Sequence, residues 1–389
     1  MRLRRSRNMT CYWHEGLFVL HPYPHGTPTA MHPAVAEILA AFEDWTGRAE
    51  AAKALDHIDP ETLEEAVLAL LGAGALLAED SPEARRDAET AETWGQWAPE
   101  APFFHYVTQD VLLGRHEETG GTPQADRADR ADRADRADQV DRADSAAMPP
   151  LFTRYEDGPR IPLPRRPADL RIPYEQVLYG RRTHRDFAPG PVARSVLATL
   201  LATTFGPVDF IDCGVGGLFR RTSPAGGSRQ EIDAYVGVLG VEDVAPGWYH
   251  YNALEHSLEL RTEGLARERA AHLAADQEWA GRAAFLVVLA ARLERMSVKY
   301  PTPRGYRVCT LNCGHLGQTF ALTATALGLG PAQTGAFHDT LVAEACALDN
   351  SGHTPLYLLA AGHPVTGGEG RDTPPPATLD TFRITRLQD

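Results

Sequence analysis

The spacing of apolar and polar residues predicts a small mixed unit at the start of the chain. Gly16–His21 (GLFVLH) suits a short strand, and apolar residues recur at helical spacing over His32–Phe42. A second helix is predicted over Asp59–Leu71, with Asp59 as its N-cap, and Ala75–Leu77 suits a closing strand. These elements around a Leu/Ala core predict a winged-helix-like domain over residues 1–100. Such a domain either docks a peptide strand or only supports the rest of the chain, and the sequence leaves both readings open.

Residues 114–150 differ in composition from the sequence on either side. Ala-Asp-Arg repeats run almost without interruption from Ala125 to Asp138, and the stretch contains no aromatic residue. It offers too little apolar surface to offset the entropy lost on ordering. Asp residues have Arg four positions later, as in Asp126 and Arg130, which favours at most a solvated helix. The stretch is therefore predicted to be a charged linker.

Helical and strand patterns are mixed from residue 164 to 389. Helices are predicted over Pro173–Gly180, Val192–Thr203, Leu265–Trp279 and Thr310–Leu327, and strands over Ile232–Val241, Ala283–Ala291 and Pro355–Ala360. Trp248–Tyr251 and Ser257–Arg261 follow the first of these strands across short turns, which predicts an antiparallel meander. The predicted class is α+β, with helices flanking a mostly antiparallel sheet.

The net charge and the length of the longest apolar run limit the classes of partner that the chain could have. The chain has 52 acidic and 38 basic residues and a formal charge of −14, which disfavours nucleic acid and anionic lipid as main partners. Ala283–Ala291 is much shorter than the ~20 residues of a spanning helix. The basic start is followed by only a short apolar patch, so no signal peptide is predicted and the cytoplasm is the expected location. Cys309, Cys313 and His315 lack a fourth ligand at a usual spacing, so no metal is expected.

Three stretches contain candidate chemistry. Arg181–Arg185 (RRTHR) crowds three guanidinium groups, which suits a phosphate unless they pair with nearby acids. Arg220–Ser228 (RRTSPAGGS) has two adjacent glycines that permit close approach to a flat ligand, although it also suits a plain connecting loop. Lys299 is one of two lysines against 36 arginines, and its cationic neighbours disfavour its protonated form. Lys299 is thus a candidate general base, or else a surface lysine.

The motifs, taken in order, resemble a known family. They are R-R-T-x-R, R-T-S-P-x-G-G with I-D-A-Y, P-G-W-Y-H-Y-N, V-K-Y with R-G-Y-R, G-H-L-G-Q-T-F, G-A-F and a final G-H-P, from about residue 172 to 364. This series resembles the SagB-type dehydrogenases, the FMN-dependent azoline oxidases of the nitroreductase superfamily. The N-terminal domain also resembles the winged-helix-like part often fused ahead of these enzymes.

The resemblance implies a nitroreductase-like α+β homodimer that holds FMN in interface clefts. It implies a catalytic pair, Lys299 and Tyr300, and the cofactor-binding residues Arg181, Arg182, Thr183, Arg185, Ser223, Ala225, Gly226, Gln318, Gly335 and Ala336. In the family scheme the arginine motif contacts the phosphate and the pyrimidine edge, and Gln318 reaches the flavin of the partner subunit. The segment at Gly335 and Ala336 presents a backbone N–H to flavin N5.

The implied function is oxidation of thiazoline or oxazoline rings to azoles in a precursor peptide, beside a cyclodehydratase. Two alternatives remain: an NAD(P)H-dependent nitro or flavin reductase, and a flavin-free scaffold of a peptide-modifying complex. The sequence departs from the family pattern R-T-S-P-S-G-G-A-L-H-P-I-E-A-Y at two places. Ala225 replaces the second Ser, and Gln230 and Glu231 stand where His-Pro is expected. The Lys-Tyr pair is intact, which favours the oxidase.

Overall fold

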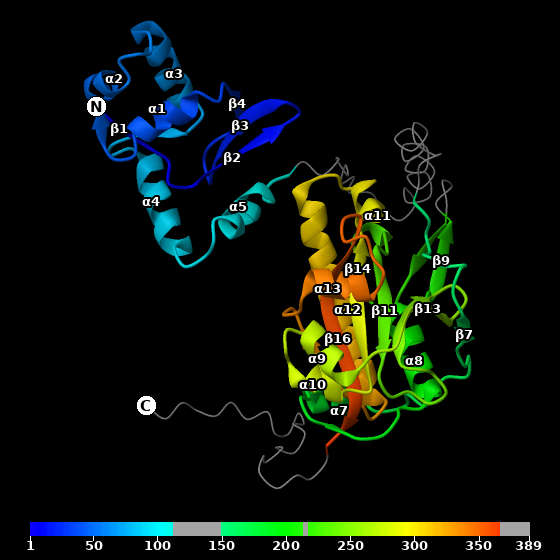
Figure 1. Cartoon of the computed structure of the whole chain (residues 1–389). Coiled ribbons are helices and arrows are strands. Elements are labelled where there is room, and N and C mark those ends of the chain that lie inside the picture. The colour runs from blue at the N-terminus through cyan, green and yellow to red at the C-terminus, as the bar shows by residue number, and fades with distance from the viewer. Residues whose placement is uncertain (112–148, 213–216, 366–389) are drawn as a thin grey trace, which may run out of the picture. The chain divides into compact units, whose positions relative to one another are not determined.

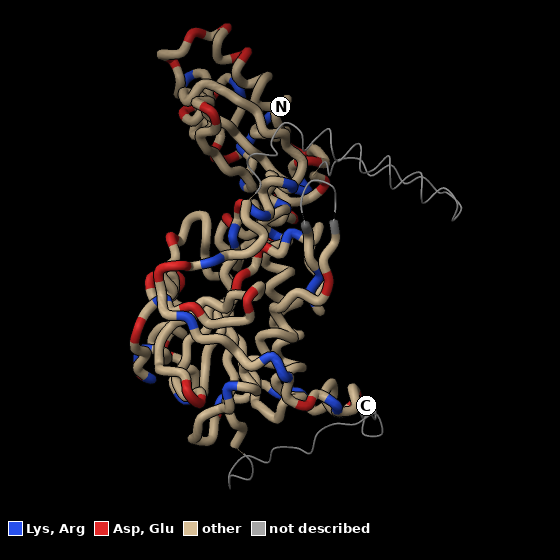
Figure 2. Tube along the Cα trace, turned by 90° about the vertical axis from the view of Figure 1, so that its right-hand side faces the viewer, with Lys and Arg blue, Asp and Glu red and all other residues tan. Residues whose placement is uncertain are grey.

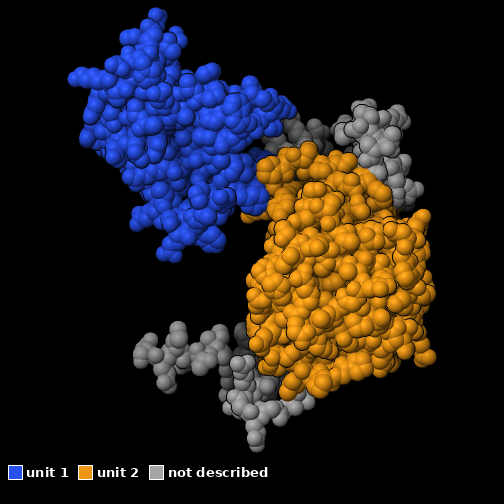
Figure 3. Space-filling model, viewed as in Figure 1, with its two compact units in different colours: residues 1–114 blue, residues 115–389 orange. Residues whose placement is uncertain are grey.

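The chain divides into two compact units, residues 1–114 and 115–389 (Figure 3). The computed structural model describes residues 1–111, 149–212 and 217–365. The Ala-Asp-Arg repeat predicted to be a linker lies outside these ranges. Acidic and basic residues are interspersed along both units (Figure 2). None of the helices in the described ranges combines the length and apolarity needed to span a bilayer.

Over its described residues, 1–111, unit 1 contains two small antiparallel sheets and five helices (Figure 1). One sheet is formed by β1 (Arg2–Arg5), β5 (Thr46–Gly47) and β6 (Leu76–Ala78), and the other by β2 (Met9–His14), β3 (Leu17–Pro22) and β4 (Thr29–Met31). The helices are α1 (Val35–Ala41), α2 (Arg48–Ala54), α3 (Pro60–Gly72), α4 (Pro82–Trp94) and α5 (Glu100–Val107). Asp59 caps α3, since its carboxylate accepts the Thr62 N–H at 3.0 Å. The winged-helix-like relationship of this unit stays a prediction.

Unit 2 is built around one large sheet with strand order β15-β16-β14-β11-β12-β13-β7, and β8 also pairs with β16. Its strands are β7 (Arg160–Pro162), β8 (Phe187–Ala188), β11 (Ile232–Val238), β12 (Gly247–Asn252), β13 (Ser257–Glu263), β14 (Phe285–Arg292), β15 (Gly330–Thr334) and β16 (His353–Pro364). All of these strand pairs are antiparallel. A separate hairpin joins β9 (Asp209–Asp212) and β10 (Gly217–Arg220).

Helices cover both faces of the large sheet (Figure 1). They are α7 (Tyr174–Gly180), α8 (Arg194–Phe205), α9 (Arg267–Leu273), α10 (Glu278–Arg282), α11 (Leu293–Ser297), α12 (Pro303–Ala326) and α13 (Asp339–Ala345), with a short 3-10 turn at Gly226–Ser228. On β14, Val287 packs in the core shared with α8 and α12, whereas Val288 packs in the core shared with α9, α10 and α13. Because both faces are covered, β14 is an unbroken apolar run. The predicted α+β class and mostly antiparallel sheet are confirmed.

Two predicted helices differ from the structure by more than the few residues seen at the other helix ends. The helix predicted over Leu265–Trp279 is two helices, because Ala275 and Asp276 adopt left-handed φ angles of 52° and 59° after α9 ends. No glycine or proline marks this break in the sequence. The long helix α12 starts at Pro303, seven residues before the predicted start, with the proline in the first turn, where it is tolerated.

Candidate active site

The glycine-rich loop of unit 2 is fixed to α12 by two hydrogen bonds. Ser223 Oγ lies 2.6 Å from Thr319 Oγ1, and the Gly226 N–H donates to Asn312 Oδ1 at 3.2 Å. A Cβ at Gly226 would lie only 2.4 Å from a methyl carbon of Val308, so the loop approaches the helix as closely as a glycine allows. The predicted cofactor residues Ser223, Ala225 and Gly226 are therefore held in one fixed turn.

Tyr300 lies against the same loop, and Lys299 directly precedes it in the chain. A Cβ at Gly227 would be 2.6 Å from the Tyr300 Oη, and Gly227 has a φ of 61°, which also favours glycine. The Lys299 Nζ is 5.4 Å from the centre of the Tyr300 ring, and the lysine side chain is exposed. The structure thus brings the predicted catalytic pair next to the predicted flavin loop.

The arginine motif lies beside the start of β15. The His184 N–H donates to the Pro331 carbonyl at 2.9 Å, and its ring occupies the space that a Cβ at Gly330 would need. Arg181 is the C-cap of α7, and Arg182 donates to the carbonyls of Tyr179 and Arg181 at 2.9 and 3.0 Å. Arg181 and Arg182 are half-buried, while Thr183 and Arg185 are exposed.

The remaining predicted cofactor residues lie along α12 and at the end of β15. Gln318 is exposed on α12, and the carbonyl of the preceding Gly317 accepts a hydrogen bond from Gln333 on β15 at 2.6 Å. A Cβ at Gly335 would meet no atom within 4 Å, so its surface is open. The Ala336 N–H donates to Thr334 Oγ1 at 3.0 Å, a bond that would have to be exchanged for this group to face a flavin.

One chain does not bring all predicted site residues together. The arginine motif lies near the C-terminal end of α12, and the pair Lys299 and Tyr300 lies just before its N-terminal end (Figure 1). With 24 residues, α12 is about 36 Å long at 1.5 Å per residue. The two groups are therefore well separated within one chain.

A buried carboxyl lies behind the glycine loop. Asn312 Nδ2 donates to Glu231 Oε1 at 2.9 Å, while Glu231 Oε2 has no nitrogen or oxygen partner among the described residues. Burial raises the pKa of Glu231, even though the Asn312 hydrogen bond opposes this shift. Burial also raises the pKa of the neighbouring Cys309 thiol to about 12, so this thiol is an unreactive core group.

A second buried polar cluster forms where β11 begins. Arg221 is buried and donates to the carbonyls of Phe205 and Ile232 at 2.9 and 3.0 Å, and burial lowers its pKa to about 10. Asp233 bonds to Arg295 on α11 at 2.9 Å. The sequence reasoning missed Asn312, Glu231 and Arg295. Asn312 stands out as a polar residue between Leu311 and Cys313, whereas Glu231 and Arg295 lie among other polar residues, and only the fold identifies their partners.

The antiparallel sheet, its two helical layers and the loop seated on α12 define an α+β domain. Residues 178–363, just under half of the chain, match the nitroreductase family. This confirms the resemblance inferred from the ordered motifs.

Three relatives illustrate the range of this similarity. MJ1384 of Methanocaldococcus jannaschii, named as a nitroreductase, is 29% identical over 50% of this chain and 92% of its own length. The trifolitoxin-processing protein TfxB of Rhizobium leguminosarum bv. trifolii is 28% identical over 41% of this chain and 44% of its own length. The microcin B17-processing protein McbC of Escherichia coli is 30% identical over 36% of this chain and 54% of its own length. The chain thus spans about half of the length of the two peptide-processing relatives.

Proposed function

We propose that the protein is an FMN-dependent dehydrogenase that oxidises thiazoline or oxazoline rings to azoles in a ribosomally made precursor peptide. The contact of Tyr300 with Gly227 carries the proposal, because it seats a Lys-Tyr pair on the loop proposed to lie against the flavin. Two of the relatives are named as a trifolitoxin-processing and a microcin B17-processing protein. The same proposal includes that the protein acts together with a cyclodehydratase and that it does so in the cytoplasm.

The residues fit FMN on structural grounds. Half-buried Arg181 and Arg182 offer guanidinium donors for a phosphate, and the glycine loop and the open backbone at Gly335 offer flat surfaces without a Cβ. Bound FMN would supply the hydride acceptor. Ser223 and Gln318 would add polar contacts along α12.

The chain's own residues would handle the proton and the orientation of the ring. Aromatisation of an azoline removes a hydride and a proton from adjacent ring carbons. Lys299 is the proposed base for the proton, and Tyr300 would orient the ring or relay the proton. The exposed Lys299 Nζ lies within reach of a substrate seated on the glycine loop.

A homodimer is part of the proposal. The arginine motif and the Lys299 pair lie at opposite ends of α12, so one complete site would need the two groups from different protomers. Exposed apolar side chains on α7 and α12, Tyr174, Leu178 and Leu311, favour such an interface. These residues would be covered when a second copy packs on these helices.

Mass spectrometry of an azoline-bearing peptide tests the reaction class. Incubation in air with the purified, FMN-loaded protein should remove two hydrogens from each azoline ring, and without oxygen one equivalent of peptide should bleach the flavin. An unchanged peptide mass in the presence of bound flavin would refute the proposal.

A second candidate is an NAD(P)H-dependent nitro or flavin reductase, favoured by the match to nearly the whole length of MJ1384. Rapid flavin bleaching by NADPH, together with no change in the peptide, would support this candidate. A purified protein that takes up no FMN would instead favour a flavin-free scaffold.

A further inference from the structure

Arg295 joins three separate stretches of unit 2 through one guanidinium group. Its Nε donates to the Pro150 carbonyl at 2.8 Å, and its Nη2 donates to Thr153 Oγ1 at 2.9 Å. Its Nη1 donates to Asp233 Oδ1 at 2.9 Å and to the Gln230 carbonyl at 3.3 Å. Arg295 is only 3% exposed. The start of the described part of unit 2, the end of the glycine loop and α11 therefore meet at this side chain.

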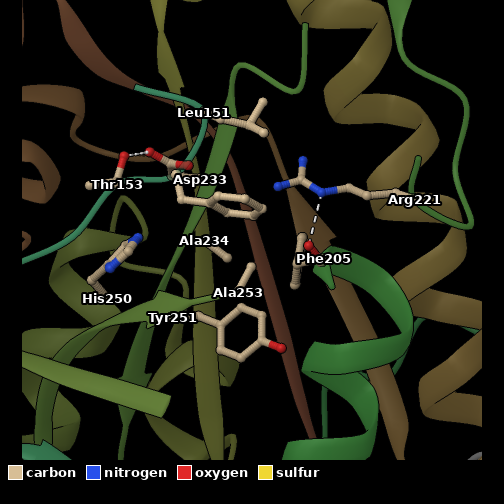
Figure 4. A pocket seen from close by; sticks show the side chains of 10 residues that line it. Leu151, Thr153, Phe205, Arg221, Asp233, Ala234, His250, Tyr251 and Ala253 are labelled. Atoms are coloured by element: carbon tan, nitrogen blue, oxygen red, sulfur yellow. Dashed lines mark hydrogen bonds between the residues drawn. The ribbon is translucent and has the colours of Figure 1, made fainter. Parts of the chain in front are cut away.

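The hydrogen-bonded cluster of Arg295, Thr153 and Asp233 is called the joint below, and Thr153 is its second member. Its hydroxyl donates to Asp233 Oδ2, accepts from Arg295, and also accepts from Arg292 Nε at 3.0 Å. Figure 4 shows the Thr153 hydroxyl and the Asp233 carboxylate meeting at the edge of a small pocket that is also lined by His250. One hydroxyl thus uses its donor and two acceptor positions on charged or buried groups.

The joint is ionic. Burial opposes ionisation of Asp233, but the neighbouring Arg295 and His250 outweigh it and hold the pKa of this carboxyl well below its usual range. Arg292 lies 3.8 Å and His353 3.6 Å from the same carboxylate. A buried ion pair whose donors are also satisfied by carbonyls fixes geometry strongly, because removal of one partner leaves the others unpaired.

The joint lies one helical turn before the proposed catalytic pair. The helix α11 ends at Ser297, and the N–H groups of Lys299 and Tyr300 donate to the Met296 carbonyl at 3.2 and 2.9 Å. Met296 follows Arg295 directly and is 2% exposed. Any shift of α11 is therefore passed through the backbone to Lys299 and Tyr300.

We propose that Arg295 is a positioning residue that uses residues 149–153 as its anchor, and that this anchor holds the Lys299–Tyr300 turn against Gly227. The first described stretch of unit 2 is thereby part of the support of the site. The catalytic meaning of this coupling rests on the proposed function, whereas the coupling between residues 149–153 and 298–302 can be measured without it.

Thr153→Val tests the coupling in the full-length chain, because valine keeps the shape and removes the hydroxyl. Amide hydrogen exchange should rise at least about tenfold in residues 298–302, because even one of the three lost hydrogen bonds to charged groups would account for that factor. Arg154→Gln is the matched control, since Arg154 lies in the same stretch but its ion pair is with Glu255, at 3.9 Å. Thr153→Ser retains the hydroxyl and should restore the wild-type exchange.

The exchange pattern decides the proposal. Faster exchange confined to residues 149–155 in Thr153→Val would overturn it, as would equal effects of Thr153→Val and Arg154→Gln on residues 298–302. If Thr153→Val fails to fold, Arg295→Lys replaces it, because lysine keeps the charge and loses the fork that reaches Pro150 and Thr153.

An activity measurement tests whether the coupling between residues 149–153 and 298–302 affects catalysis. Thr153→Val should lower kcat for azole formation about tenfold with KM and FMN affinity unchanged, the split expected when a transition-state contact is misplaced. Unchanged kcat in a variant with altered exchange would refute the positioning role. Absence of azoline oxidation by the wild-type protein would refute the proposed function alone, and the exchange result would still decide the coupling.

Discussion

At the scale of single residues, lysine has an unusual distribution in this chain. Lys53 and Lys299 are the two lysines among 38 basic residues. Lys53 lies in the last turn of α2 in unit 1, where a cation is favourable for the helix, whereas Lys299 lies beside the ring of Tyr300, which contacts the glycine loop. The composition pointed to Lys299 as a candidate, but its neighbours Tyr300 and Gly227 were needed to relate it to a site.

Replacement of Lys299 by Ala should leave FMN bound and slow azole formation by at least about 10²-fold, the usual contribution of a general base. Single-turnover flavin bleaching by an azoline peptide measures this step directly. Lys53→Ala is the control, because it removes the other lysine and leaves unit 2 intact. Wild-type turnover by the Lys299 variant would exclude this residue from the proton transfer.

Glu231 is a residue whose role the sequence could not give. The pattern showed only that Gln230 and Glu231 stand where the family has His-Pro. In the fold, Glu231 is fully buried and bonds to Asn312, which in turn holds Gly226. The two bonded pairs are separated by 81 and 86 positions along the chain. Such contacts depend on tertiary packing and leave no local pattern in the sequence.

Glu231→Gln should stabilise the protein increasingly as the pH rises. Burial raises the folded-state pKa of Glu231 above its ordinary value of 4.5, so the folded state holds the proton more tightly than the unfolded chain. The wild type therefore loses stability as the pH rises from about 4.5 towards the folded-state pKa, by about 1.4 kcal/mol per pH unit, while glutamine does not titrate.

Thermal unfolding of both proteins between about pH 5 and pH 8 measures this difference. The exposed Glu242→Gln provides the control, and its stability should follow that of the wild type throughout the range. A gap between Glu231→Gln and wild type that stays constant with pH would contradict a Glu231 pKa raised by burial.

At the scale of elements, the apolar pattern predicted the centre of unit 2 well and its helix boundaries less well. The meander of β11, β12 and β13 and the buried strand β14 lie where the alternation and the apolar run indicated. The break between α9 and α10 was missed because an alanine and an aspartate, rather than a glycine, take the left-handed conformation. The early start of α12 was missed because its first turns carry Arg and Tyr rather than an apolar face.

The candidate site was less predictable than the fold. Motif order identified the loop, the lysine pair and the arginine segment, but periodicity contains no information on distances between them. The structure adds that the loop is fixed to α12 at Thr319 and Asn312 and that the arginine segment is fixed to β15 at Pro331. These attachments are long-range contacts, which no local pattern encodes.

At the scale of the whole molecule, the separation of the two residue groups along α12 predicts a symmetric dimer. Leu311→Asp should raise the dimer dissociation constant at least about a hundredfold, because two symmetry-related leucines each contribute about 1.5–3 kcal/mol when buried. Sedimentation equilibrium measures this change, and FMN retention should fall with it.

Leu68→Asp is the matched control for this experiment. Leu68 lies on α3 of unit 1 and is 54% exposed, against 56% for Leu311. The control should sediment as the wild type does and keep its flavin. A Leu311→Asp variant that remains a dimer and retains FMN would place the interface elsewhere.

The joint at Arg295 also affects how unit 2 can be prepared in isolation. The sequence pattern alone would suggest a start for expression near residue 164, ahead of the first clear helix. A protein cut there would lack Pro150 and Thr153, which removes two hydrogen bonds of the buried Arg295 guanidinium and one of the buried Asp233 carboxylate. A shortened protein for crystallisation or calorimetry should therefore begin no later than residue 149.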